Sequence, residues 1–135
     1  MTGLLKLEFV SLIIKRVASA VSLSKTQLRI LMAVGDAPQE GLKQMDVLPI
    51  FDRDAMTLSQ VVKKLIKMDY VKQETDPKDR RIKILFLTKS GRTLYKKALG
   101  LVDKEKSSLA NAMGKKKLNQ LEGLAEEAAG FFNWP

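Results

Sequence analysis

Hydrophobic and polar residues alternate along this chain with two different periods, and the first of them is helical. From residue 3 to residue 22, apolar side chains recur every three or four positions, which predicts an amphipathic helix. Its apolar surface is wider than one stripe and therefore needs cover on more than one side. Ser24 and Gln27 form a capping-box pattern at the start of a second helix, which Gly35 is expected to end in a left-handed conformation.

Two further helices are predicted before the pattern changes. The third is short, from about Leu42 to Leu48, and Pro49 is expected to stop it. The fourth follows Asp52 or Asp54, either of which can cap its first turn. Its outer face is polar and basic, so the third and fourth helices together have the layout of a helix-turn-helix. The apolar stripe of the fourth helix consists of Leu58, Val61, Val62, Leu65 and Ile66.

The period then shortens to two residues, which is the spacing of a β-strand. Residues 70–75 and 81–87 are predicted to pair as a two-stranded hairpin around the charged turn DPKD. Thr88 can cap a long helix from about Lys89 to Ala112, and a last helix is expected from about Lys117 to Phe132. The expected fold is therefore mainly α-helical, with about six helices and a small β-hairpin wing.

The composition limits the chemistry that the chain can perform. With 135 residues, 45% of them hydrophobic, it is expected to form one folded domain. It contains neither cysteine nor histidine, which excludes disulfides and removes the usual zinc ligands and most acid–base or nucleophile–base pairs. We therefore expect no enzyme, no cofactor and a reducing, cytoplasmic location. Charges interrupt the apolar segment from Leu4 to Val21, which argues against a membrane span or a signal peptide.

The charge of the chain points to a partner instead. The formal net charge is +9, which favours a polyanion, with nucleic acid before an anionic membrane. Half of the 24 lysines and arginines lie between residues 63 and 97, in about a quarter of the chain, and are predicted to fall on the fourth helix and the hairpin. Any one of these side chains could simply be a solvated surface charge. A cluster is more informative, because clustered cations gain affinity for phosphate backbones through counterion release.

Three stretches resemble, in this order, the MarR family of winged helix-turn-helix regulators: LSKTQLRILMAVG, LSQVVKKLIKMDYV and DPKDRRIKILFLTKSGRTLY. The resemblance covers roughly residues 23 to 97. It includes the Leu-x-x-x-Gln helix start, the Asp-Arg-Arg sequence at the hairpin tip and the Leu-Thr-x-x-Gly start of the following helix. It implies a homodimer that binds double-stranded DNA and regulates transcription, commonly as a repressor.

The resemblance also implies which side chains meet DNA. Ser59 and Gln60 stand where the family contacts base edges, and glutamine in place of the frequent arginine would favour adenine over guanine. The family uses one wing arginine in the minor groove and an aspartate–arginine pair to hold the tip. Asp79 would be the stabilising aspartate, but the roles of the two arginines stay open. The expected DNA-binding residues are Thr57, Ser59, Gln60, Lys63, Lys64, Lys78, Arg80 and Arg81.

The family pairs its subunits through the N- and C-terminal helices. Within a single domain of residues 1–135, this implies a dimerisation helix (1–22), a winged helix-turn-helix core (23–97) and C-terminal dimerisation helices (98–135). A partner would then cover the wide apolar face of the first helix. The aromatic side chains of Phe131, Phe132 and Trp134 would be buried either in the partner or against the first helix.

A small-molecule effector of unknown identity is a further expectation from the resemblance. Relatives often bind small aromatic acids between the reading head and the dimerisation helices. Nothing in the spacing of the residues singles out such a site in this chain. The cationic candidates are Lys15, Arg16 and Lys25.

Two other functions fit the same pattern. One is a winged-helix protein–protein adaptor, in which the hairpin and the fourth helix dock a protein partner. The other is an accessory or architectural DNA-binding protein that controls no gene. The adaptor would ignore duplex DNA, whereas the architectural protein would bind it without acting at its own promoter.

Overall fold

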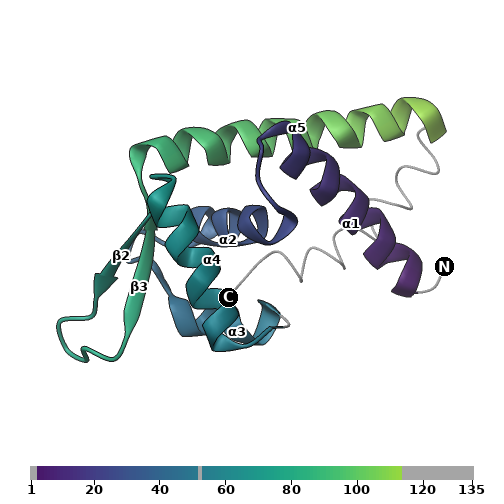
Figure 1. Cartoon of the computed structure of the whole chain (residues 1–135). Helices are drawn as coiled ribbons and strands as arrows, with labels where there is room; N and C mark the ends of the chain where they lie inside the picture. The colour runs from purple at the N-terminus through teal and green to yellow at the C-terminus, as the bar shows by residue number, and fades with distance from the viewer. Residues whose placement is uncertain (1–2, 52, 114–135) are drawn as a thin grey trace.

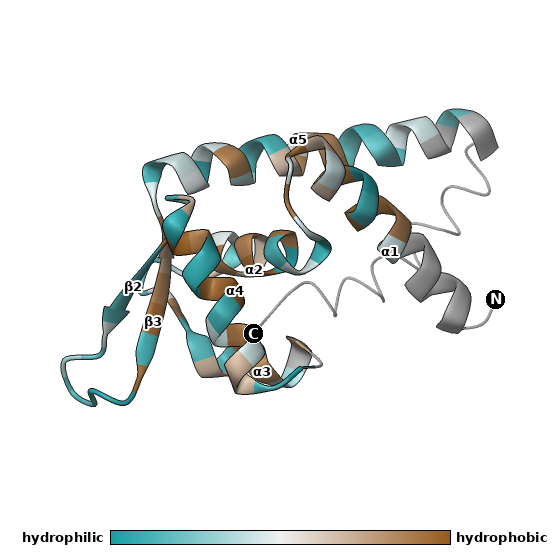
Figure 2. Ribbon diagram, in the orientation of Figure 1, coloured by the Kyte–Doolittle hydropathy of each residue, from teal (hydrophilic) through white to brown (hydrophobic). Residues whose placement is uncertain are grey.

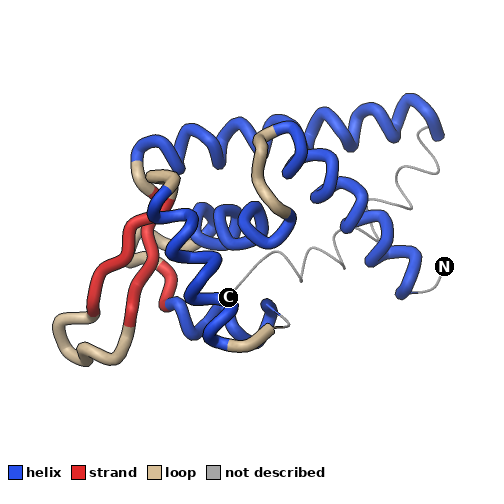
Figure 3. Tube along the Cα trace, in the orientation of Figure 1, coloured by secondary structure: helices blue, strands red, loops and turns tan. Residues whose placement is uncertain are grey.

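The computed structural model describes residues 3–51 and 53–113 (Figure 1). Figure 3 distinguishes the helices, strands and loops within these residues. In chain order the helices and strands are α1 (Gly3–Ala20), α2 (Lys25–Asp36), β1 (Leu42–Lys43), α3 (Gln44–Phe51), α4 (Ala55–Lys67), β2 (Val71–Thr75), β3 (Lys83–Leu87) and α5 (Lys89–Met113). The mainly helical fold with a small wing is confirmed. The last predicted helix, Lys117 to Phe132, lies outside the described residues.

The sheet contains the predicted hairpin and one strand that was not predicted. Strands β2 and β3 pair antiparallel with Val71 opposite Leu87, and β1 adds to the other side of β3 with Leu42 opposite Leu85. The predicted two-stranded hairpin is therefore confirmed, and β1 is a third strand of the sheet that was not predicted. A strand of two residues is too short to show a period of two, so the sequence pattern could not reveal it.

The segment predicted as a helix from Leu42 to Leu48 is also different. Its first two residues form β1, and α3 begins only at Gln44 and continues through Pro49 to Phe51. Pro49 was expected to stop this helix. Proline keeps a helical φ and here removes one backbone donor near the end of a short helix, so two more helical residues can follow it.

The start of α2 is as predicted, but its end is not. Ser24 and Gln27 form the capping box, with the Gln27 N–H donating to Ser24 Oγ at 3.1 Å and the Ser24 N–H donating to Gln27 Oε1 at 2.9 Å. Gly35 does not end the helix in a left-handed conformation, because α2 runs on to Asp36. Gly35 is instead buried against the ring of Tyr95, where a Cβ atom would clash. The Tyr95 hydroxyl donates to the Asp36 carboxylate, so this contact ties α2 to α5.

Two hydrophobic clusters share α2 between them. Leu28 and Leu31 of α2 pack with α1 and α5, through side chains that include Val17 and Ala98. On its other side, Ile30, Ala33 and Val34 of α2 pack with α3, α4 and the sheet. The second cluster also contains Leu42, Val47, Phe51, Leu58, Val62, Leu65, Val71 and Leu85. Helix α2 therefore packs against α3, α4 and the sheet on one face and against α1 and α5 on the other.

Part of the apolar face of α1 is covered within the chain itself. Ile13, Ile14, Val17, Ala18 and Val21 are all buried in the cluster with α2 and α5. These five residues therefore need no partner subunit to cover them. None of the helices in the described ranges combines the length and the apolar character needed to cross a membrane.

Candidate nucleic-acid interface

Helix α4 begins at a well-defined cap. Of the two aspartates that could cap it, Asp54 does so, with its Oδ1 accepting the Thr57 N–H at 2.7 Å. The pKa of Asp54 lies below its ordinary value, because the carboxylate accepts hydrogen bonds from the backbone and the side chain of Thr57. The cap fixes the residue at which the helix starts and thereby which side chains its outer face presents.

The two faces of α4 are chemically distinct. Leu58, Val62 and Leu65 are buried in the core, whereas Gln60, Lys63, Lys64 and Lys67 are exposed on the opposite side. Thr57 and Ser59 are half-buried at the border between the two faces. The polar side chains predicted to read DNA are thus presented outward or at the edge of the exposed face, with no carboxylate among them.

The wing tip is a tight turn held by the Asp79 carboxylate. Its Oδ1 accepts the Arg81 backbone N–H at 3.0 Å and Arg81 Nε at 3.1 Å, and its Oδ2 accepts Arg81 Nη2 at 3.1 Å. The Arg81 side chain, and after it the Arg81 backbone N–H, hold the pKa of Asp79 below the ordinary range. Asp76 supports the same turn, because its Oδ1 accepts the Lys78 N–H at 2.8 Å.

This geometry distinguishes the two wing arginines, which the sequence could not do. Arg81 makes a two-pronged ion pair with Asp79, even though its side chain is 90% exposed. Arg80 is exposed and forms no ion pair with a carboxylate of the described residues. Lys78 is likewise exposed on the tip. In Figure 2 most of the loop between β2 and β3 has the teal colour of hydrophilic residues.

The base of the wing is packed closely against the start of α5. The Tyr70 carbonyl accepts the Thr88 N–H at 3.1 Å, and Thr88 Oγ1 accepts the Gly91 N–H at 2.9 Å as the predicted helix cap. Gly91 lies so close to the Tyr70 carbonyl oxygen that a Cβ atom would collide with it. The glycine of the Leu-Thr-x-x-Gly pattern is thus required by a close approach of two backbones.

The twelve cations between residues 63 and 97 are all exposed, but they divide into two groups. Eight lie on α4 and the wing, and the wing tip and the N-terminal end of α4 point to the same end of the molecule (Figure 1). The other four, Lys89, Arg92, Lys96 and Lys97, lie on α5, which crosses the opposite end (Figure 1). The prediction that the whole cluster lies on the helix and hairpin is therefore wrong for these four.

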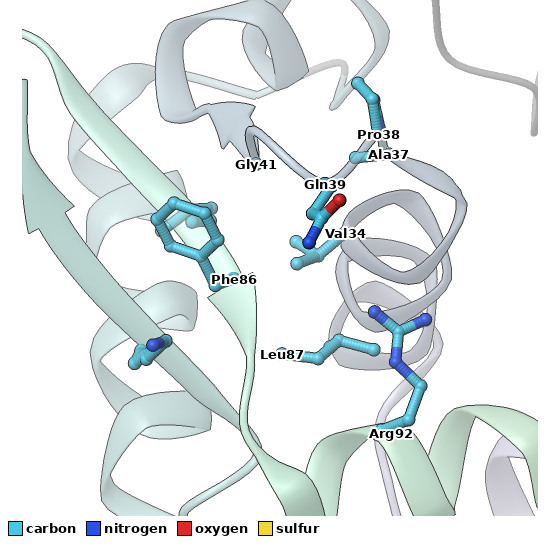
Figure 4. A pocket seen from close by; sticks show the side chains of 10 residues that line it. Val34, Ala37, Pro38, Gln39, Gly41, Phe86, Leu87 and Arg92 are labelled. Carbon is cyan, nitrogen blue, oxygen red and sulfur yellow. The ribbon is translucent and has the colours of Figure 1, made fainter.

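A cavity of about 380 Å³ lies between the end of α2, strand β3 and the start of α5. Figure 4 shows the Phe86 ring and the Arg92 guanidinium pointing toward it from different elements. The cations proposed for an effector do not line it. Two of them have other partners, since Arg16 pairs with Glu105 at 3.3 Å and Lys25 donates to Ser11 Oγ at 3.3 Å. The effector site therefore stays a prediction.

One outward residue of α4 was not predicted from the sequence. Met56 lies one helical turn before Gln60 and is exposed. Counting back four positions from Gln60 on the expected helix would have found it, because residues four apart share a face. Methionine is an apolar residue, however, and the apolar stripe of this helix was assigned to the core.

Helices α2, α3 and α4, together with the small antiparallel sheet and its charged hairpin, define a winged helix-turn-helix protein. The family model described as MarR family matches residues 21–82 of the chain. No curated protein sequence matches it significantly. The matched segment is similar to the MarR family, and the fold of the chain agrees with that likeness.

Solved structures support the fold over nearly the whole chain. The crystal structure of MarR has a TM-score of 0.75 at 21% identity and covers 93% of this chain and 84% of that one. The complex of Staphylococcus aureus MepR with DNA has a TM-score of 0.71 at 19% identity, covering 96% and 98%. NadR in complex with 4-hydroxyphenylacetate has a TM-score of 0.66 at 22% identity, covering 86% and 81%. At these identities the likeness concerns the fold.

Proposed function

We propose that the chain is a sequence-specific transcription regulator that binds double-stranded DNA. The observation that carries the proposal is the common direction of α4 and the wing tip, both of which expose cations (Figure 1). The tip carboxylates of Asp76 and Asp79 meanwhile accept hydrogen bonds within their own turn. An α-helix fits the major groove, and a slender cationic tip fits the narrow groove beside it. One of the similar structures, that of MepR, is a complex with DNA.

The proposed contacts follow from the position of each side chain. Gln60 and Ser59 of α4 reach base edges in the major groove, and Thr57, Lys63, Lys64 and Lys78 meet phosphates or flanking bases. Arg80 enters the minor groove, because its guanidinium is exposed and unpaired within the described ranges. Arg81 keeps the tip in shape through Asp79, which lowers the ordering cost of binding.

We further propose that two chains bind DNA together and that the bound dimer represses transcription. The core division at residues 23–97 would place α1 and most of α5 in the subunit contact. Leu12 of α1 and Leu99 of α5 remain exposed in the described structure and are available for this contact. A two-fold pair would read half-sites about one helical turn apart.

The test is a salt series of DNA binding, measured by fluorescence anisotropy with a random duplex and with a duplex selected from a random pool. If the protein contacts six or more phosphates, raising the salt concentration from 50 to 200 mM should lower the affinity about a thousandfold. The selected duplex should bind more tightly than the random one at every salt concentration. A chain that binds no duplex in dilute buffer is an adaptor, and one that binds both duplexes equally is an architectural protein.

A pair of matched variants locates the contact. Replacing Lys63 and Lys64 together by alanine should make the salt dependence shallower, by roughly 0.9 in the log–log slope for each phosphate that the variant no longer neutralises. Replacing Lys96 and Lys97, an equally adjacent and exposed pair on α5, should leave the slope unchanged. Equal effects of the two double variants would contradict the assignment of α4 to the DNA.

A further inference from the structure

Helix α4 exposes two large apolar side chains, Met56 and Ile66, and the proposed function uses neither. Met56 is the second residue of α4 and is 73% exposed, the highest value among the large hydrophobic side chains described. Scattered exposed apolar residues are normal on protein surfaces. Met56 differs from them in its position, because it lies on the face of α4 that we place against DNA.

The helical geometry puts Met56 in the middle of that face. At about 100° per residue, Gln60 lies about 40° from Met56 around the helix axis and Lys63 about 20° from it on the other side. Leu58, which is buried, lies about 200° away, and therefore nearly opposite. Met56 is thus flanked by a predicted base-reading side chain and a predicted phosphate-binding one.

Its place along the helix is equally specific. A recognition helix contacts base edges chiefly with residues near its N-terminus. Asp54 caps α4 by accepting the Thr57 N–H, so Met56 lies within the first turn, two residues after the cap. This end of α4 points in the same direction as the wing tip (Figure 1).

The chemistry of the major groove offers one partner to an apolar side chain. Base edges there are hydrogen-bond donors and acceptors, except for the C5-methyl group of thymine. Methionine is unbranched and flexible, so it can adjust to the position of that methyl group. Contact between the two removes apolar surface of both from water.

We propose that Met56 contacts the 5-methyl group of a thymine in each half-site and thereby helps to select the DNA sequence. This inference rests on the proposed function and adds one specificity-determining residue to it. It requires that the thymine lie within reach of α4, next to the base pair that Gln60 reads.

Replacement of thymine by uracil tests the contact, because it removes the methyl group and leaves the hydrogen-bonding edge unchanged. A duplex selected by the wild-type chain is synthesised with uracil at one thymine position of the half-site at a time. At one position the wild-type chain should lose affinity about fourfold, which is the effect expected for one buried methyl-sized group. Met56→Ala should bind the thymine duplex about fourfold more weakly than wild type and should be indifferent to uracil at that position.

Met45→Ala is the matched control. Met45 is also a methionine and is 60% exposed, but it lies on α3. Its variant should keep the wild-type sensitivity to uracil. Both substitutions place alanine on an exposed helix surface, where it favours the helix, so neither should unfold the chain.

Three results would overturn the inference while leaving DNA binding by the chain intact. The first is a Met56→Ala variant that binds as tightly as wild type. The second is a variant that loses the same factor with thymine and with uracil at every position. The third is a wild-type chain that is insensitive to uracil throughout the half-site. A wild-type chain that binds no duplex contradicts the proposed function itself, and this inference with it.

Discussion

The base of the wing and its tip lie at the two ends of the same pair of strands, but different kinds of contact stabilise them. At the base, the backbones of Tyr70, Thr88 and Gly91 approach one another closely, and Gly91 is buried. At the tip, the turn is held by an ion pair between Asp79 and Arg81, whose side chain is almost fully exposed. One end depends on fixed backbone atoms and the other on side chains in water.

This difference separates folding from binding within one hairpin. A buried backbone contact has no room to relax, so a change at the base should lower the free energy of unfolding. Exposed ion pairs contribute little to stability, so a change at the tip should leave folding intact and act on the ligand. The following predictions test whether the two ends can be separated in this way.

The largest effect is expected at the base, from Gly91→Ala. Its Cβ atom would collide with the Tyr70 carbonyl oxygen, which cannot move without breaking its hydrogen bond to the Thr88 N–H. We expect a loss of about 3 kcal/mol in the free energy of unfolding, the upper end of the cost of overpacking. Urea denaturation followed by circular dichroism measures it.

Gly100→Ala is the control for this variant. Gly100 lies in the same helix, is exposed, and has no atom within 4 Å of an added Cβ. The same substitution should therefore raise the free energy of unfolding by about 0.5–1 kcal/mol, because alanine favours a helix interior over glycine. Equal effects at positions 91 and 100 would show that helix propensity, and not the close approach to Tyr70, decides the outcome.

A smaller effect, on binding alone, is expected from Arg80→Ala. The exposed Arg80 guanidinium is the group that we place in the minor groove, and its loss should weaken binding to a selected duplex about tenfold, or about 1.4 kcal/mol. The urea midpoint should not change, since Arg80 makes no ion pair within the described ranges. Anisotropy titrations and denaturation of the same sample provide both values.

A double-mutant cycle separates Arg80 from Arg81. Arg81 pairs with Asp79, so the effect on DNA affinity of Asp79→Ala should depend on whether Arg81 is present. It should not depend on Arg80. Coupling of Asp79 to Arg80 in place of Arg81 would reverse the roles that we give to the two arginines.

The parts of the fold that were predictable from the sequence are those set by local patterns. The Ser24–Gln27 capping box, the strands of the hairpin and the cap of α5 at Thr88 each depend on residues close together in the chain. The errors came from contacts between distant residues. Gly35 was assigned to a helix end, but it is small because Tyr95, 60 positions later, occupies the space beside it.

At the candidate site, too, the sequence predicted the local pattern but not which residues are in contact. Sequence and resemblance together predicted an aspartate–arginine pair at the wing tip, and the structure contains one. Arg80 and Arg81 are neighbours of equal charge, so no pattern could choose between them. The conformation of the turn determines which arginine pairs with Asp79, because the carboxylate that binds the Arg81 side chain also accepts the Arg81 backbone N–H. Whether either arginine meets DNA is still a prediction.

The smallest predicted effect concerns the charge of Asp79. Because the Arg81 guanidinium and backbone N–H favour the carboxylate, the pKa of Asp79 in the folded chain lies below the ordinary value of 3.8. The tip contact is therefore complete above that value and is lost only as the pH falls through the lower, folded-state pKa. Asp79→Asn should weaken DNA binding less than fivefold, roughly the range of an exposed ion pair, with no change in the urea midpoint.

The pKa itself can be followed through the carboxyl carbon of Asp79 in an NMR titration. Arg81→Ala should return that pKa toward the ordinary value, whereas Arg80→Ala should leave it where it is. If the pKa of Asp79 shifts in Arg80→Ala instead, then Arg80 is the residue that pairs with Asp79. The minor-groove role would then pass to Arg81. A pKa unmoved by either variant would mean that the tip is held by its backbone hydrogen bonds alone. The exposed ion pair would then have no part in presenting Arg80 to the DNA.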